Sequence, residues 1–186
     1  MEAGELLSPS DVLDLAVLGV TSEHARTAAE VIAVVKRVGG ARFQPTAEVI
    51  AGRIAALAEA GLLTRVAGAA AAGVLWQPSP AGRAHIERLL VMQSSSPANA
   101  LAAVCASLKI CFLDMLEPDA RDAVIDGLMA AHRRALQDAQ AALAGCPCRC
   151  AFVQRYLAHD VERWQAELSW LEALARDVET ARPGWL

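Results

Sequence analysis

The sequence has few aromatic residues, and it has no apolar run long enough to cross a membrane. Phe, Trp and Tyr make up 4 % of the 186 residues, although 55 % of the chain is hydrophobic. Strands draw on aromatic and β-branched side chains, so a chain rich in alanine and leucine is expected to be mainly helical. No window offers about 18 consecutive apolar residues, and the amino terminus has no signal-peptide pattern. We therefore expect a cytoplasmic protein without a membrane partner.

Catalytic signatures and an excess of positive charge are also missing. The chain has no Ser-His-Asp set, no paired carboxylates and no Gly-rich phosphate loop, so we expect neither an enzyme nor a cofactor. Its formal net charge is −4, whereas nucleic-acid binders usually present an excess of cations to the phosphates. The charge is uneven, because residues 26–88 contain eight Lys or Arg and four acids, while residues 93–186 contain nine and twelve. A nucleic-acid interface is therefore expected in the amino-terminal half.

That half has the order of elements of a winged helix-turn-helix domain. Ser8 caps a first helix, and Thr27 with Glu30 forms a capping box for a second. A third helix is predicted from about Thr46 to a stop at Gly61. Two strand-like runs, LLTRVAG and GVLWQ, then predict a β-hairpin, and SPAGR opens a closing helix. We assign residues 8–92 to this domain.

Three segments resemble the PadR family of bacterial transcriptional regulators in order and spacing: LDLAVLGV, IAALAEAGLL and WQPSPAGRAHIERLL. The resemblance implies that the third helix docks in the major groove of DNA, that the hairpin wing touches the backbone, and that a carboxy-terminal helical region forms the dimer. The chain departs from the family at Ala51, usually a tyrosine, and at Ala55 and Ala56, commonly basic or polar. Its wing tip, GAAAAG, lacks arginine. These departures leave few groups for contact with DNA.

Eight residues are candidates for contact with double-stranded DNA. Arg53 and Thr46, on the third helix, are the predicted contacts to bases or phosphates. The others flank that helix or lie on or near the second helix, which crosses the DNA backbone in such folds: Arg42, Gln44, Arg65, Arg26, Lys36 and Arg37. Side chains of these kinds are also ordinary solvated surface residues, so the sequence leaves both roles open.

The carboxy-terminal half, residues 98–180, is predicted to form the helical dimerisation and effector domain. A helix is expected over residues 100–116, and another restarts at Pro118 and runs to Gly145. The last helix has apolar residues at alternating steps of four and three, and RYLAHDVERWQAELSWLEAL resembles the carboxy-terminal PadR region. The seam expected to pack across the dimer axis consists of Leu157, Val161, Trp164, Leu168 and Leu171.

Two further features of this half have several interpretations. Trp164 and Trp170 are candidates for lining a pocket for a small-molecule effector, or for packing alone. Cys146, Cys148 and Cys150 form the motif CPCRC between the last two helices. These thiols are candidates for redox sensing or for binding a soft metal, while the proline of the motif equally suits a plain turn.

Together these observations predict a mainly α protein with a small β-hairpin, in which a winged helix-turn-helix domain is joined to a long-helix dimerisation region. We expect a repressor that acts as a homodimer on a palindromic operator. The alternative is a PadR-like dimer that has lost sequence-specific DNA binding and acts as a protein-interaction module, with thiol or metal sensing through CPCRC compatible with either role.

Overall fold

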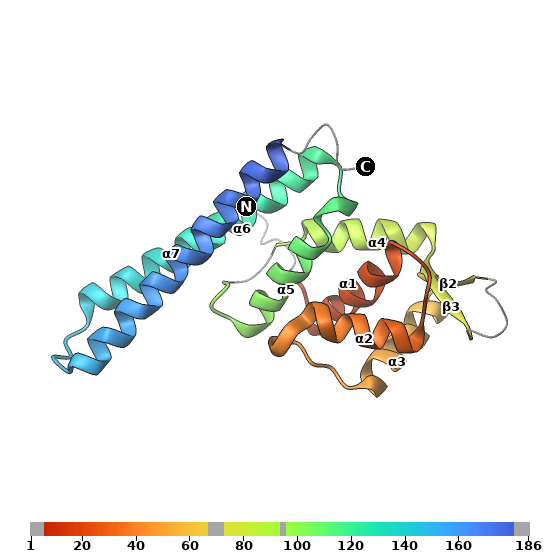
Figure 1. Ribbon diagram of the computed structural model, residues 1–186, viewed down its shortest axis with the longest axis horizontal. Helices are drawn as coiled ribbons and strands as arrows, with labels where there is room; N and C mark the ends of the chain where they lie inside the picture. Colours follow the sequence, from red (N-terminus) through yellow and green to blue (C-terminus); the bar gives the residue numbers. More distant parts are fainter. Residues whose placement is uncertain (1–5, 67–72, 94–95, 181–186) are drawn as a thin grey trace.

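Two parts of the structure can be distinguished in Figure 1: a body built of helices α1 to α5 with a small sheet, and an arm built of the long helices α6 and α7. The structure is a computed structural model, and it describes residues 6–66, 73–93 and 96–180. No helix in these described ranges is long and apolar enough to span a membrane.

The elements of the body follow the predicted order. Its first helices are α1 (Pro9–Ser22), α2 (Ala28–Gly39) and α3 (Ala47–Glu59), with a short 3-10 helix, η1 (Gly40–Arg42), before α3. Strands β2 (Leu63–Val66) and β3 (Leu75–Pro78) pair antiparallel, which confirms the hairpin, and α4 (Pro80–Val91) follows. The predicted wing tip GAAAAG spans residues 68–73, and all of it but Gly73 lies outside the described residues.

The sequence prediction missed a third strand. β1 (Arg26–Thr27) pairs antiparallel with β3, so the sheet has the order β1-β3-β2. Two residues are too few to show the alternation by which a strand is recognised in a sequence. The strand exists because β3 offers a free edge beside the start of α2.

Caps predicted from the sequence set the ends of α2 and α3. Thr27 and Glu30 form the capping box, since each side chain accepts a hydrogen bond from the other's backbone N–H, at 3.3 and 2.8 Å. Gly61 has a φ of 71°, and the N–H of Leu62 donates to the carbonyl of Leu57 at 2.8 Å. This left-handed ending satisfies the last carbonyls of α3 and turns the chain into β2.

The core is centred on α1 and continues beyond the winged helix. Leu15 and Leu18 of α1 are fully buried, and α2, α3 and α4 pack around them. Helix α5 (Ala100–Cys111) also packs against α1 and α2, and the buried cluster extends through Leu108 and Leu128 to Leu171 in the arm. The core therefore has no break at the predicted domain boundary, and the division into two domains stays a prediction.

Helix α5 is shorter than predicted. It ends at Cys111, and a 3-10 helix, η2 (Leu113–Met115), replaces its last predicted turn. The ring of Phe112 packs at Gly19 of α1, where a Cβ atom would lie 2.4 Å from it. Burial of this ring against α1 is more favourable than one further turn of α5. The hydrophobic period of the sequence could not reveal this contact.

A buried lysine on α5 forms a hydrogen bond with the end of α4. Lys109 is 3 % exposed, and its ammonium donates to the backbone carbonyl of Met92. Burial lowers the pKa of Lys109 to about 8, because the charged form loses its hydration.

Part of the apolar seam of the arm packs within the chain, and its place in a dimer interface stays a prediction. Helices α6 (Pro118–Gly145) and α7 (Ala151–Thr180) lie side by side. Trp164 is 3 % exposed and packs with Ala135 and Ala139 of α6, and Leu171 is 1 % exposed in the main core. The other seam residues are half-buried: Leu157, Val161 and Leu168. A period of four and three requires a partner helix but does not say which chain supplies it.

Candidate nucleic-acid interface

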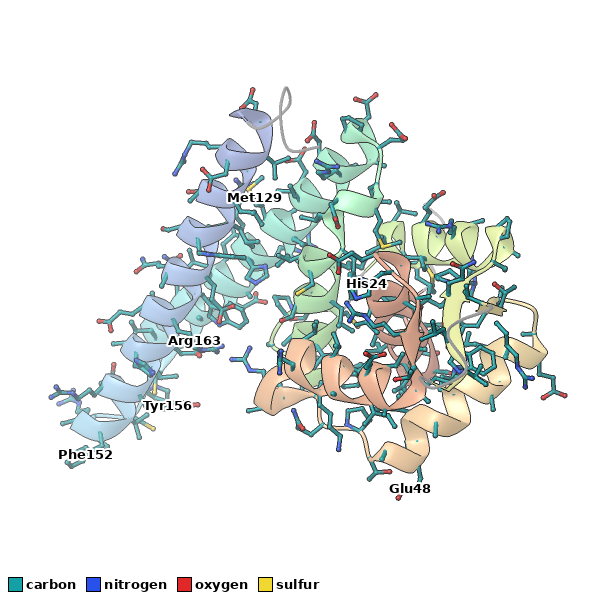
Figure 2. The ribbon with its side chains drawn as sticks, turned by 45° about the vertical axis from the view of Figure 1, so that its right-hand side comes forward. His24, Glu48, Met129, Phe152, Tyr156 and Arg163 are labelled. Atoms are coloured by element: carbon teal, nitrogen blue, oxygen red, sulfur yellow. The ribbon has the colours of Figure 1, made fainter. Side chains whose placement is uncertain are left out.

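The outer face of α3 carries acidic and small apolar side chains. Glu48, Ala51, Ala55 and Glu59 are exposed, and Val49 is 47 % exposed. Glu48 projects into solvent at the beginning of the helix (Figure 2). Within α3, all of whose residues are described, this face presents no Lys or Arg. This face therefore offers carboxylates and small apolar groups, but no cationic group, to a ligand.

Arg53, the one cation of α3, turns inward to Asp14 on α1. Its Nε and Nη2 donate to the two carboxylate oxygens, and the side chains are 28 % and 5 % exposed. This pairing raises the pKa of Arg53. Two of its donor groups are thus used inside the fold, a structural role that the sequence did not indicate. Contact of Arg53 with DNA stays a prediction.

His85 of α4 lies against the same carboxylate. Its Nε2 is 3.5 Å from Oδ2 of Asp14, and its Nδ1 is 3.1 Å from Nη2 of Arg88. Asp14 therefore joins α1, α3 and α4 at the centre of the body. Sequence reasoning missed this group because 39 residues separate Asp14 from Arg53. A signal was available, since Asp14 is a charged residue among the apolar positions of its helix.

Arg26 is also held by the fold. Its Nε donates to the backbone carbonyl of Val20 at 2.6 Å, and its Nη2 lies 3.3 Å from a carboxylate oxygen of Glu23. The side chain is 16 % exposed. Arg26 thus ties β1 to the end of α1.

Gln44 and Thr46 shape the turn that leads into α3. The amide of Gln44 donates to the carbonyl of Lys36 at 2.9 Å and also to that of Gly40. The hydroxyl of Thr46 caps α3 by accepting the N–H of Val49 at 3.4 Å. Both side chains stay exposed, so these bonds position α3 without removing either residue from the surface.

The remaining predicted cations flank α3. Arg37, in the last turn of α2, is exposed, and its neighbour Lys36 is half-buried. Arg65 on β2 is exposed, with its guanidinium 5.4 Å from the ring centre of Trp76. A shallow groove of about 560 Å³ separates the wing from α3, and small side chains such as Ala51 and Ala55 line it together with Arg65 and Trp76. The geometry therefore places cations beside α3 and apolar groups along it.

A second cavity, of about 440 Å³, lies between the body and the arm. Arg42, which we expected at the DNA, lines it together with His132, Arg163 and Trp170. Trp170 thus lines a cavity, and its contact with an effector stays a prediction. Trp164 does not, because its ring is buried in the arm and meets that of His132 edge-on at 5.7 Å.

The three thiols of CPCRC lie in the turn between α6 and α7. Among the described residues, no group of three or more His, Cys, Asp or Glu side chains is placed to hold a metal ion. The interpretation of Cys146, Cys148 and Cys150 as a metal site therefore finds no support in the geometry.

Comparison with known proteins gives one family match. Residues 3–175 match the family described as “Putative AphA-like transcriptional regulator”. This match confirms the prediction of a transcriptional regulator. No curated protein matches the chain.

Solved structures of PadR from Bacillus subtilis are similar, as the resemblance of the three sequence segments predicted. The complex with operator DNA is 17 % identical, with a TM-score of 0.42, over 90 % of this chain and 99 % of that one. The complex with p-coumaric acid is 17 % identical, with a TM-score of 0.43, over 93 % and 98 %.

Proposed function

We propose, because this chain belongs to the AphA-like family of transcriptional regulators, that it binds double-stranded DNA in the cytoplasm as a homodimer and represses transcription from a palindromic operator. The observation that carries this proposal is the exposed α3 of a winged helix, flanked by cations on both sides. Its task is binding rather than catalysis, as for other regulators.

Phosphate contacts are assigned to the flanking cations. Arg37 and Lys36 lie in the last turn of α2, and Arg65 lies on the wing. The three cations therefore flank the outer face of α3. Thr46 adds its exposed hydroxyl at the amino-terminal end of α3, where the helix dipole favours a phosphate. These groups fix the position of the protein on the duplex without reading its sequence.

Base contacts are assigned to the small apolar side chains of α3. Val49, Ala51 and Ala55 are exposed there, and apolar side chains contact the methyl group of thymine in the major groove. Glu48 and Glu59 on the same face repel phosphates, which favours approach in one orientation. We therefore expect an operator rich in A·T pairs at the contacted positions.

Dimerisation is assigned to an aromatic face of α7 beside the seam that α6 covers. Phe152, Tyr156 and Trp170 are 83 %, 69 % and 54 % exposed, and their spacing places them on one side of the helix. Figure 2 places Phe152 at the outer end of the arm, with Tyr156 next to it. Exposed aromatic groups on one face are typical of protein interfaces. A second copy packed there would let paired α3 helices meet successive major grooves, about 34 to 36 Å apart.

The cavity between body and arm is the proposed effector site. Arg42, Arg163 and His132 supply polar contacts, and Trp170 supplies an aromatic wall. A ligand bound there touches η1, which leads into α3, and also α7 of the proposed dimer interface. Binding can thereby change the spacing of the two α3 helices.

A salt titration of DNA binding tests the proposal. Selection from random duplexes supplies the operator, and the binding constant is then measured between 50 and about 200 mM salt. We expect sequence-specific binding whose logarithm falls linearly with the logarithm of the salt concentration. Arg65→Gln removes one phosphate contact per subunit, so the slope should become shallower by about 2. Arg134→Gln, an exposed cation of the arm, is the control and should leave the slope unchanged.

The second candidate function is a protein-interaction module. The observation in its favour is the cation-free outer face of α3 beside the apolar groove of the wing. Weak binding that is equal for all sequences at low salt, and absent at physiological salt, would support this function and refute the operator proposal.

A further inference from the structure

We propose that CPCRC is a peroxide-reactive dithiol site, in which the Cys150 thiolate reduces a hydroperoxide and a second thiol of the motif then closes a disulfide with it. The proposal goes beyond DNA binding and does not depend on it. It rests on the placement of three thiols at the tip of the arm.

The motif is exposed and held in one turn. Cys148 and Cys150 are exposed, and Cys146 is half-buried. The side-chain amide of Gln154 donates to the carbonyl of Cys148 at 2.8 Å, and its backbone N–H donates to the carbonyl of Cys150 at 3.1 Å. Gln154, in the first turn of α7, thus holds the backbone at both Cys148 and Cys150. A small oxidant reaches these thiols from solvent.

Cys150 has the environment of a nucleophilic thiol. It directly precedes α7, next to the backbone N–H groups of Phe152 and Val153 in the first turn of that helix. These groups have no partner within the helix, and they favour the thiolate, as does the positive end of the helix dipole. They lower the pKa of Cys150, and the thiolate is the form that attacks peroxide.

The neighbouring thiol has the opposite character. The neighbouring thiol of Cys146 raises the pKa of Cys148. Cys148 therefore holds its proton more strongly than Cys150, although both are exposed. Burial raises the pKa of Cys105 in the core, which leaves that thiol inert.

The chemistry balances with one hydroperoxide per site. The Cys150 thiolate attacks the outer oxygen of ROOH, the O–O bond breaks, and ROH leaves after taking up a proton, so the sulfur becomes a sulfenic acid. The thiolate of Cys146 or Cys148 then attacks that sulfur, and water leaves with the proton of the attacking thiol. Two thiols are oxidised to a disulfide, and the peroxide is reduced to an alcohol, or to water when R is hydrogen.

Trypsin gives a direct readout because Arg149 separates the thiols. Full-length protein is treated with one equivalent of hydrogen peroxide, the remaining thiols are alkylated, and the digest is analysed without reduction. We expect the peptide 135–149, which carries Cys146 and Cys148, to be linked to the peptide 150–155, which carries Cys150. The undigested chain should run as a monomer on a denaturing gel without reductant.

Matched variants assign the attacking thiol. Cys150→Ser keeps a good helix cap, so the fold should persist while peroxide consumption and the linked peptide disappear. Cys111→Ser, an exposed thiol outside the motif, should leave both unchanged. In the untreated protein at pH 7, Cys150 should alkylate on the order of tenfold faster than Cys148, reflecting the difference in thiolate population.

Three outcomes would overturn the proposal. The first is a disulfide confined to the peptide 135–149, which would exclude Cys150. The second is a covalent dimer on the denaturing gel, and the third is oxidation that persists unchanged in Cys150→Ser.

Discussion

At the scale of single residues, Asp14 and Arg53 decide how the recognition surface is to be interpreted. Arg53 is the one cation of α3, yet its guanidinium is paired with a carboxylate that is buried under the helix. Removing Arg53 would therefore disturb the fold as well as any contact with DNA. A loss of DNA binding in such a variant does not by itself show that Arg53 reads a base.

The stability of Arg53→Gln separates these two roles. We expect the free energy of unfolding to fall by about 3 kcal/mol, because the buried carboxylate of Asp14 loses its charged partner. Urea denaturation measures this loss. Arg37→Gln, on the exposed surface of α2, should change stability by less than about 0.5 kcal/mol.

A double-mutant cycle checks the physical reason. Asp14→Asn combined with Arg53→Gln should cost less than the sum of the two single changes, because the second change removes a group already left without its partner. If Arg53→Gln unfolds at the same urea concentration as the unsubstituted protein, the ion pair does not stabilise the fold, and the DNA role of Arg53 gains weight.

At the scale of elements, the motif SPAGR acts through packing rather than through chemistry. The hydroxyl of Ser79 donates to the carbonyl of Gly61 at 2.7 Å and accepts the N–H of Gly82 at 3.0 Å. A Cβ atom at Gly82 would lie 2.1 Å from the carbonyl oxygen of Leu62. Glycine at this position therefore allows α4 to approach the chain between α3 and the wing.

Gly82→Ala should separate α4 from that segment. The added methyl group overlaps a backbone atom that cannot rotate away, so we expect the free energy of unfolding to fall by about 2 to 3 kcal/mol. Gly127→Ala is the control, because no atom lies within 4 Å of its Cβ position on α6. The control should leave stability unchanged or raise it by up to about 1 kcal/mol. Equal effects of the two changes would contradict the close approach.

At the scale of the whole molecule, the arm decides how two copies meet. Trp164 and Leu171 of the seam are buried within the chain, so the proposed dimer is assigned to the aromatic face of α7. In light scattering at micromolar concentration, the protein should have twice the chain mass of 19.6 kDa. Phe152→Asp with Tyr156→Asp should shift it towards a single chain mass, because burying two carboxylates in an interface opposes association.

Gln165→Asp adds one negative charge at an exposed position on another face of α7, and it should leave the dimer intact. A doubly substituted protein that keeps twice the chain mass would show that the dimer forms elsewhere. Circular dichroism of each variant establishes that the arm is still helical.

Much of the fold could be predicted because its signals are local. Ser8, Thr27, Ser79 and Gly61 mark helix ends where the structure has them, since caps and stops act within a few residues. Strand β1, the early end of α5 and the pairing of Asp14 with Arg53 could not be predicted. Each depends on residues that are distant in the sequence and meet only in the folded chain.

The sequence by itself determined the order of the helices, the wing, and the type of face that each helix presents, because hydrophobic period and capping are properties of short segments. Only the tertiary structure decided which surfaces remain free. It turned the one cation of α3 inward, covered part of the seam of α7 with α6, and placed Arg42 and Trp170 in the lining of one cavity. The hydrophobic period of a helix indicates which of its faces is buried. The tertiary fold determines which element covers that face.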